Sequence, residues 1–155
     1  MIELKKMTIQ DAKHICCWRY EDEYSVYNLP EWKVAKEDGY DITKSDKRES
    51  EFMSIYLNNE LMGYGRISLR DNQVVLGIGI KPDQCSKGYG NKAFKLLIQE
   101  AKTRSNDESI VLIVRSFNER AIKCYKKNHF IIINELDLNN QGESVKFTKM
   151  LYVNR

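Results

Sequence analysis

The sequence has few of the features that mark membrane, secreted or metal-binding proteins. Its longest apolar run, residues 110–114, is far shorter than the ~20 residues that cross a bilayer. The first residues, 1–6, contain neither an apolar stretch nor a small-residue cleavage site, so we expect no signal peptide. The two histidines, His14 and His129, lie far apart and the cysteines form no CxxC pair. We therefore expect a cytoplasmic protein that binds no metal.

Charge of one sign is not concentrated anywhere in the chain. Lys and Arg (25) are interleaved with Asp and Glu (22) almost throughout, although the net charge is +3. A nucleic-acid groove would gather basic residues on one face. We thus expect neither a nucleic-acid nor a membrane partner. The adjacent Cys16 and Cys17 are interpreted as small apolar side chains on a helix, reduced in the cytosol.

The size and composition are those of one ordinary globular domain. The chain has 155 residues, of which 42% are apolar and 30% charged. This length is close to the commonest size of a single domain. We expect one domain over residues 1–155.

The first half of the chain has the pattern of an antiparallel meander. Thr8 is placed to cap a helix that should end near Tyr20, with Asp11 in its first turn. Residues 21–48 are irregular, apart from a short helix at 31–36 with Pro30 in its first turn. Turns at 58–60 and 71–72 separate runs of strand character. The predicted strands are 1–7, 51–57, 61–69 and 74–80.

The second half alternates helices and strands. Helical periodicity covers 87–104 and 118–128, and the β-branched run 109–114 is typical of a strand buried on both faces. Residues 130–133 and 145–153 are the closing strands. Antiparallel strands followed by a strand–helix–strand crossover predict a mixed sheet covered by helices, an α/β (α+β) fold.

The most informative segment is a glycine-containing turn between a strand and a helix, residues 77–93. The first amides of such a helix have no intrachain partner, and the helix dipole adds partial positive charge. Gly88 and Gly90 let the backbone approach a ligand closely, and Lys87 and Lys92 add charge. These features suit a pyrophosphate group.

Residues 88–93 also match the dinucleotide-binding pattern GxGxxA. That pattern expects an acidic residue at the end of the next strand to bind a ribose. Here the strand ends Val114-Arg-Ser-Phe-Asn118, which contains no acid. A dinucleotide-binding enzyme is therefore the disfavoured alternative.

Two blocks of the sequence resemble the GCN5-related N-acetyltransferase (GNAT) family. Cys85-Ser-Lys-Gly-Tyr-Gly90 is in register with the family's Gln/Arg-x-x-Gly-x-Gly/Ala signature, with Cys85 at the Gln/Arg position. Residues 118–130 resemble the family's Asn-x-x-Ala-x-x-x-Tyr-x-x-x-Gly-Phe block. His129 stands where the family usually has Gly, which ends the helix in a left-handed conformation. The first third resembles the RimJ/RimL-like branch.

The resemblance implies a fold and a chemistry. The fold is a GNAT-like mixed, mostly antiparallel central sheet of about six to seven strands flanked by about four helices. The activity is transfer of the acetyl group of acetyl-CoA, a cosubstrate used without a metal, directly to an amine. Tyr125 is then the general acid that protonates the leaving CoA thiolate. The implied cofactor-binding residues are Ile78, Ile80, Cys85, Ser86, Lys87, Gly88, Tyr89, Gly90, Asn91, Asn118 and Ala121.

Within that set, the backbone of Ile78 and Ile80 pairs with the pantetheine arm, and an amide at Ile80 polarises the thioester carbonyl. Turn residues 87–91 hold the pyrophosphate. Asn118 caps its helix and reaches the pantetheine arm. Cys85 as a covalent nucleophile is disfavoured, because no histidine lies nearby in sequence to activate it.

The acceptor and the base are less defined. Carboxylates and aromatic rings at 20–27 suit a cationic amine, although a solvated loop is an equal alternative. Glu21, Glu23, Tyr24 and Tyr27 are the candidate substrate-binding residues. The base is left open between Glu21, Glu23, a water chain and an amine that arrives neutral. The acceptor is a small molecule or a protein N-terminus, and a homodimer is compatible with the family. A non-catalytic CoA-binding regulatory or interaction module is the second alternative.

Overall fold

The computed structural model describes residues 1–85, 87–140 and 142–154. They form two compact units: one contains residues 1–66 and 78–97, the other 67–77 and 98–155. The strands β3 (Glu60–Arg70) and β4 (Gln73–Ile80) and helix α4 (Tyr89–Arg104) contribute to both units. The strands form a seven-stranded sheet in the order β1-β2-β3-β4-β5-β7-β6. This confirms the predicted mixed, mostly antiparallel sheet.

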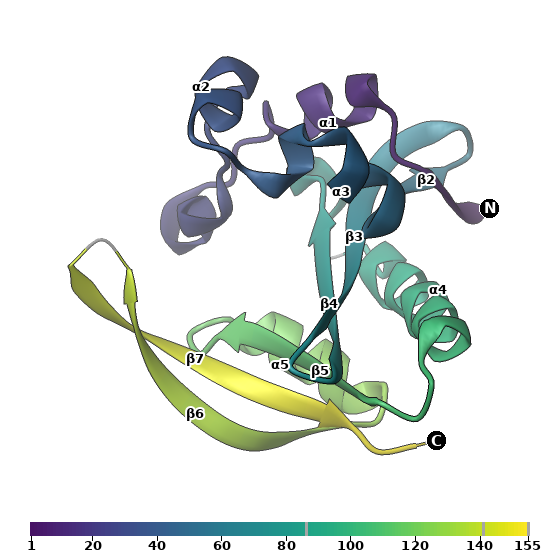
Figure 1. The fold of residues 1–155 in the computed structure, drawn as a ribbon, viewed down its shortest axis with the longest axis vertical. Helices are drawn as coiled ribbons and strands as arrows, with labels where there is room; N and C mark the ends of the chain where they lie inside the picture. The colour runs from purple at the N-terminus through teal and green to yellow at the C-terminus, as the bar shows by residue number, and fades with distance from the viewer. Residues whose placement is uncertain (86, 141, 155) are drawn as a thin grey trace. The chain divides into compact units, whose positions relative to one another are not determined.

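The first unit is a meander with short helices. It contains β1 (Ile2–Lys6), β2 (Phe52–Leu57), α1 (Ile9–Ile15), α2 (Trp32–Glu37) and α3 (Ser45–Ser50), with 3-10 turns η1 (Asp22–Tyr27), η2 (Asp41–Thr43) and η3 (Pro82–Gln84). Strand β2 pairs antiparallel with both β1 and β3. The helices α1, α2 and α3 all contact η2 and lie together in Figure 1. Their core gathers Ala12, Ile15, Trp18, Ala35 and Phe52.

The start of α1 follows the local sequence closely. The Thr8 side chain accepts a hydrogen bond from the Asp11 amide, and the Asp11 carboxylate accepts one from the Thr8 amide, a complete capping box. The predicted extension to Tyr20 is wrong, because α1 ends at Ile15. Cys16 is buried at its C-cap, whereas Cys17 is exposed in a turn outside the helix. Pro30 precedes the N-cap of α2 and so lies outside its first turn.

An ion-pair group ties β3 to the helical segment of the first unit. The Arg66 guanidinium donates to Asp41 at 2.6 Å and to Glu51 at 2.8 Å, and lies over the Phe52 ring at 4.8 Å. The Arg66 hydrogen bond holds the pKa of the Asp41 carboxyl below its usual range. Helix α3 was not predicted, because its polar sequence has only Arg48 buried and therefore shows no apolar periodicity.

The second unit contains a parallel pair and a long hairpin. Strand β5 (Ser109–Arg115) runs parallel to β4 and antiparallel to β7 (Glu143–Tyr152), which pairs with β6 (Phe130–Asn140). Figure 1 shows β6 and β7 as one extended hairpin, and helix α5 (Glu119–Lys127) contacts β6. Buried side chains include Ile110, Val111 and Met150. Ile113, by contrast, is 44% exposed, so β5 is not buried on both faces throughout.

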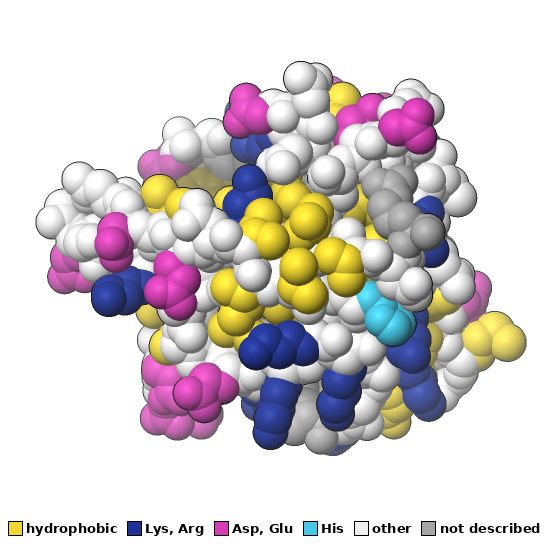
Figure 2. Space-filling view, turned by 90° about the horizontal axis from the view of Figure 1, so that it is seen from below, with side chains coloured by type: hydrophobic (Ala, Val, Ile, Leu, Met, Phe, Trp, Pro, Cys, Tyr) yellow, Lys and Arg dark blue, Asp and Glu magenta, His cyan; other side chains and the backbone are white. Residues whose placement is uncertain are grey.

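Strand β6 extends well beyond the predicted 130–133. Its side chains are exposed along most of its length, and Ile131, Ile132 and Ile133 are 43–47% exposed. Residues 135–139, Glu-Leu-Asp-Leu-Asn, alternate polar and apolar side chains, a pattern typical of a strand that the predicted bounds left out. Figure 2 shows a face of the molecule on which apolar side chains gather, bordered by Lys and Arg side chains.

The left-handed conformation expected at His129 is present, with φ of 70°. Its amide donates to the Lys126 carbonyl and its carbonyl accepts from the Val153 amide, so the backbone turns from α5 into β6 there. His129 is exposed, and its side chain therefore contributes little packing. The strain of a left-handed non-glycine residue is about 1–2 kcal/mol.

We expect His129→Gly to stabilise the protein by about 0.5–1 kcal/mol. Relief of the left-handed strain exceeds the extra backbone entropy of glycine, which is about 0.5–1 kcal/mol. Urea unfolding measures the change. His14→Gly, the same substitution in the last turn of α1, is the control and should destabilise. A loss of stability in His129→Gly would contradict the strain argument.

Candidate functional site

The end of β4 presents backbone groups at one edge. A β-carbon added to Gly63 would lie 2.7 Å from the Gly79 carbonyl oxygen, and the Lys81 amide donates to Met62, so both groups face β3. Because N–H and C=O groups alternate between the two edges of a strand, those of Ile78 and Ile80 face the opposite edge. The parallel ladder with β5 covers Gln73–Leu76 of β4, and Ile78 and Ile80 lie beyond it.

The segment after β4 turns through η3 and then into α4. Helix α4 begins at Tyr89, two residues later than predicted, and Gly88 precedes it with φ of 83°. No atom lies within 4 Å of a β-carbon built on Gly88, so this turn is open. A β-carbon on Gly90 would lie 3.6 Å from Cγ1 of Ile80, an ordinary contact that alanine also satisfies. The helix start is thus packed on the strand end.

The remaining predicted turn residues lie around this helix start. Lys87 is exposed, while Tyr89 and Asn91 are half-buried in the first turn of α4. Ser86 lies outside the described residues. The Cys85 thiol is 3.6 Å from the carbonyl oxygens of Ile80 and Lys81, so it lies against the end of β4. A positively polarised helix start next to an open glycine is suited to a phosphate group.

Tyr20 also reaches the end of β4, which sequence reasoning did not predict. Its hydroxyl donates to the Ile80 carbonyl at 2.6 Å, across 60 residues of sequence. Burial, with smaller contributions from Tyr64 and Cys85, raises the pKa of the Tyr20 phenol well above its usual value. The phenol therefore remains a protonated donor. The only sequence signal was its place at the start of the acidic, aromatic segment.

The candidate acceptor-binding residues come directly after Tyr20 in the sequence. Glu21 and Glu23 are exposed, and Tyr24 and Tyr27 are half-buried in η1. The Tyr27 ring meets the Tyr20 ring edge-on, with centroids 6.4 Å apart. The structure thus brings this segment and the end of β4 together.

The second sequence motif, residues 118–130, begins at the N-terminus of helix α5, which belongs to the second unit. The Asn118 side-chain oxygen accepts from the Ala121 amide at 3.2 Å, which confirms the predicted N-cap. Tyr125 lies one turn after Ala121 on the same helix, half-buried, with its ring centroid 6.4 Å from that of Phe130. Asn118, Ala121 and Tyr125 therefore share a helix whose start is set by local sequence.

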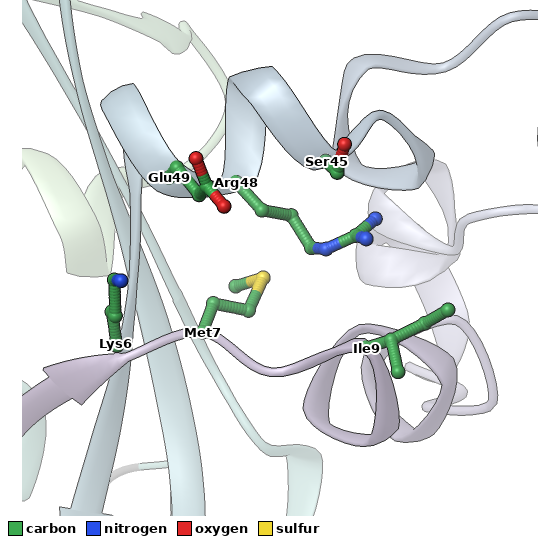
Figure 3. A pocket seen from close by; sticks show the side chains of 6 residues that line it. All are labelled: Lys6, Met7, Ile9, Ser45, Arg48 and Glu49. Atoms are coloured by element: carbon green, nitrogen blue, oxygen red, sulfur yellow. The ribbon is translucent and has the colours of Figure 1, made fainter.

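A separate pocket of about 220 Å³ lies in the first unit (Figure 3). Arg48 crosses it in the figure, and its guanidinium donates to the Ile42 carbonyl at 3.0 Å. The described residues that line it include none of the predicted site residues: Lys6, Met7, Ile9, Ser45, Arg48 and Glu49. We assign it no part in the site.

The described part of the chain contains neither a candidate metal site nor a candidate membrane span. Within it, no three His, Cys, Asp or Glu side chains are grouped as metal ligands would be. No helix there has the length and apolar character needed to span a membrane. All four cysteines are free thiols.

Comparison with known proteins agrees with the fold. Residues 10–130 match the family model described as the acetyltransferase (GNAT) family. A spermidine N-acetyltransferase chimera from Vibrio cholerae and hSSAT is 16% identical, with a TM-score of 0.76 over 98% of this chain and 95% of the other. The ribosomal-protein-S18-alanine N-acetyltransferase from Escherichia coli is 16% identical, with a TM-score of 0.70 over 97% and 92%. A GNAT-family acetyltransferase from Bacillus anthracis is 12% identical, with a TM-score of 0.79 over 97% and 93%.

The mixed sheet and its helices thus have the α/β fold of a class of acyltransferases. The chain belongs to the GNAT acetyltransferase family, whose model covers most of its length, and it is an N-acetyltransferase. The family uses acetyl-CoA as the acetyl donor. This assignment leaves no support for the dinucleotide-binding alternative at residues 88–93.

Proposed function

We propose that this chain transfers the acetyl group of acetyl-CoA directly to an amine, with residues 1–155 acting as one catalytic domain in the cytoplasm. The observation that carries the proposal is the end of β4. There an edge of backbone groups, at Ile78 and Ile80, runs into an open left-handed Gly88 and the start of α4. The edge suits the amide-containing pantetheine arm, and the helix start suits the pyrophosphate.

Each residue then has a defined part in binding. The backbone of Ile78 and Ile80 pairs with the pantetheine arm, and the Ile80 amide donates to the thioester carbonyl oxygen as negative charge develops there. Residues 87–91 hold the pyrophosphate, with Ser86 and Cys85 beside them. Asn118 and Ala121 at the start of α5 contact the pantetheine arm.

Tyr125 supplies the proton for the leaving group. The amine nitrogen attacks the thioester carbonyl carbon, the carbon–sulfur bond breaks, and the thiolate takes the phenol proton of Tyr125. A cationic acceptor first loses one proton to water or to a carboxylate such as Glu21 or Glu23, which frees the lone pair that attacks. The second proton, lost from the nitrogen after attack, restores the Tyr125 phenol through water. No covalent step at Cys85 is required. The RimJ/RimL-like branch and the homodimer remain predictions.

The acceptor is proposed to be a cationic amine, small or at a protein N-terminus. Glu21 and Glu23 are exposed on the segment attached to the end of β4, and Tyr24 and Tyr27 offer ring faces beside them. Carboxylates and aromatic faces attract ammonium groups. Two structural neighbours, a spermidine N-acetyltransferase chimera and a ribosomal-protein-S18-alanine N-acetyltransferase, are named for acceptors that are both amines.

Thermal unfolding with and without acetyl-CoA tests the cofactor, with NAD and NADP as controls. At 100 times its dissociation constant, acetyl-CoA should stabilise the protein by about 2.7 kcal/mol and raise Tm by roughly 5–10 °C. In Gly88→Ala the shift should fall by about half, since a β-carbon in the open turn weakens binding about tenfold.

Gly39→Ala is the matched control. Gly39 has φ of 74° and equally open surroundings, so alanine introduces the same backbone strain away from the site. It should keep the full acetyl-CoA shift. A response to NAD or NADP alone, or equal shifts in the two variants, would count against the proposed turn.

Release of the CoA thiol, followed across a panel of amines, tests the reaction itself. Turnover with at least one cationic amine supports the enzyme. Acetyl-CoA binding without turnover on any amine would instead favour the non-catalytic CoA-binding module.

A further inference from the structure

The last peptide of β4 is held from both sides. The Ile80 carbonyl accepts the Tyr20 hydroxyl at 2.6 Å, and the Lys81 amide of the same peptide donates to the Met62 carbonyl at 2.7 Å. These two groups point in opposite directions from one planar unit. Two hydrogen bonds on opposite sides therefore fix the rotation of this peptide about the strand axis.

The N–H proposed to bind the thioester, that of Ile80, belongs to the adjoining Gly79–Ile80 peptide, so this fixed peptide is its immediate neighbour in the chain. The N–H and C=O of Ile80 face the same edge of β4, away from β3. The Tyr20 hydroxyl donates to the Ile80 carbonyl, and the Ile80 amide points to the same side of the strand. A thioester carbonyl bound by that amide lies beside the Tyr20 phenol.

Tyr20 is itself held by its own segment. Its amide donates to Oδ1 of Asn28 at 2.6 Å, and Nδ2 of Asn28 donates back to the Tyr20 carbonyl at 3.4 Å. These two bonds close residues 20–28 into a loop whose ends lie together. Glu21 and Glu23 are exposed on this loop, so its attachment to Ile80 sets where they lie.

We propose that Tyr20 is a positioning residue for acetyl transfer: its hydroxyl fixes the Ile80–Lys81 peptide, next to the Ile80 amide that binds the thioester carbonyl, and attaches the acidic acceptor segment to that point. The inference rests on the proposed function. Tyr20 exchanges no proton with substrate in this scheme, since its hydrogen is already donated to Ile80. The family motifs at 85–90 and 118–130 contain neither Tyr20 nor Asn28.

The test compares the binding of acetyl-CoA and CoA by titration calorimetry. CoA has the pantetheine arm and the phosphates but lacks the thioester carbonyl. In the wild type, one additional hydrogen bond should favour acetyl-CoA by roughly three- to tenfold. In Tyr20→Phe the preference should fall below about twofold, with the affinity for CoA reduced less than that for acetyl-CoA. The thioester contact depends on the Ile80 amide alone, whereas the pantetheine arm, which CoA also carries, is bound at Ile78 as well.

Two further variants sharpen the result. Tyr40→Phe removes a hydroxyl from an exposed tyrosine of the same unit and should keep the wild-type preference. Asn28→Ala leaves the phenol in place but releases its backbone, and should reduce the preference in the same direction. It serves as the independent test if Tyr20→Phe does not fold. With an acceptor found, kcat of Tyr20→Phe at saturating acetyl-CoA should be about tenfold lower.

The outcomes separate the two proposals. Wild-type protein that binds neither CoA nor acetyl-CoA would overturn the proposed function and this inference with it. Wild-type protein that binds both equally, or a Tyr20→Phe variant that keeps the preference, would overturn the role of Tyr20 alone. Equal weakening of both ligands in the variant would show a general structural role and would also overturn it.

Discussion

Tyr125→Phe is expected to lower kcat by about 10²–10⁴-fold while the dissociation constant of acetyl-CoA changes little. The substitution removes one hydroxyl, and the ring that packs near Phe130 remains. General acid catalysis contributes about this factor, since an unprotonated thiolate returns readily to the carbonyl carbon. Steady-state release of CoA measures kcat, and calorimetry measures binding.

Tyr152→Phe is the matched control for this substitution. Tyr152 packs on the same Phe130 ring, with centroids 5.3 Å apart, and lies outside the family motif. Its loss of a hydroxyl should leave kcat within about twofold of the wild type. Unchanged turnover in Tyr125→Phe would show that the thiolate leaves without this proton donor, whereas loss of acetyl-CoA binding would show that Tyr125 is structural.

Asp11→Ala is expected to destabilise the first unit by about 3–5 kcal/mol. The carboxylate is 5% exposed, and it accepts hydrogen bonds from Ser54 at 2.7 Å, Tyr56 at 2.5 Å and the Thr8 amide at 3.2 Å. Alanine leaves these donors without their charged acceptor and also removes half of the capping box. Urea unfolding at pH 7 measures the loss. Asp38→Ala, an exposed aspartate at the C-cap of α2, should change stability by less than about 0.5 kcal/mol.

The same carboxylate makes stability depend on pH. Burial alone raises the pKa of Asp11, but hydrogen bonds from Tyr56, Ser54 and Thr8 bring it below the usual value. Its contribution is therefore present above the unfolded pKa of about 3.9 and is lost as the pH falls through the lower folded value. The difference in stability between wild type and Asp11→Ala should shrink between pH 5 and about pH 2. A constant difference over that range would contradict this account.

Several elements could be predicted because their determinants are local. Thr8 and Asn118 cap helices through hydrogen bonds to residues three positions away. The turn at Asp71 and Asn72 uses residues that tolerate positive φ, and both have it. The left-handed turn at His129 followed from one motif position. Each of these depends on a few consecutive residues.

Other elements could not be predicted because their determinants are distant or lack a pattern. The end of α1 at Ile15 is set where the chain leaves to bury Trp18, although apolar residues continue past it. The second half of β6 is a different case, because residues 135–139, Glu-Leu-Asp-Leu-Asn, alternate polar and apolar side chains and the prediction left this signal out. The close packing of α4 on β3 depends on residues far apart in the sequence. A β-carbon added to Gly65 would lie only 2.3 Å from Cδ2 of Leu97.

The sequence by itself determined the family, the glycine turn and the helix caps, and it supplies the prediction that Tyr125 is the general acid. Those conclusions rest on motifs of no more than 13 consecutive residues. Only the tertiary structure decided that Tyr20 donates to Ile80 and that residues 20–28 are attached to the end of β4. A hydrogen bond across 60 residues depends on the path of the whole intervening chain, and no local pattern encodes that path.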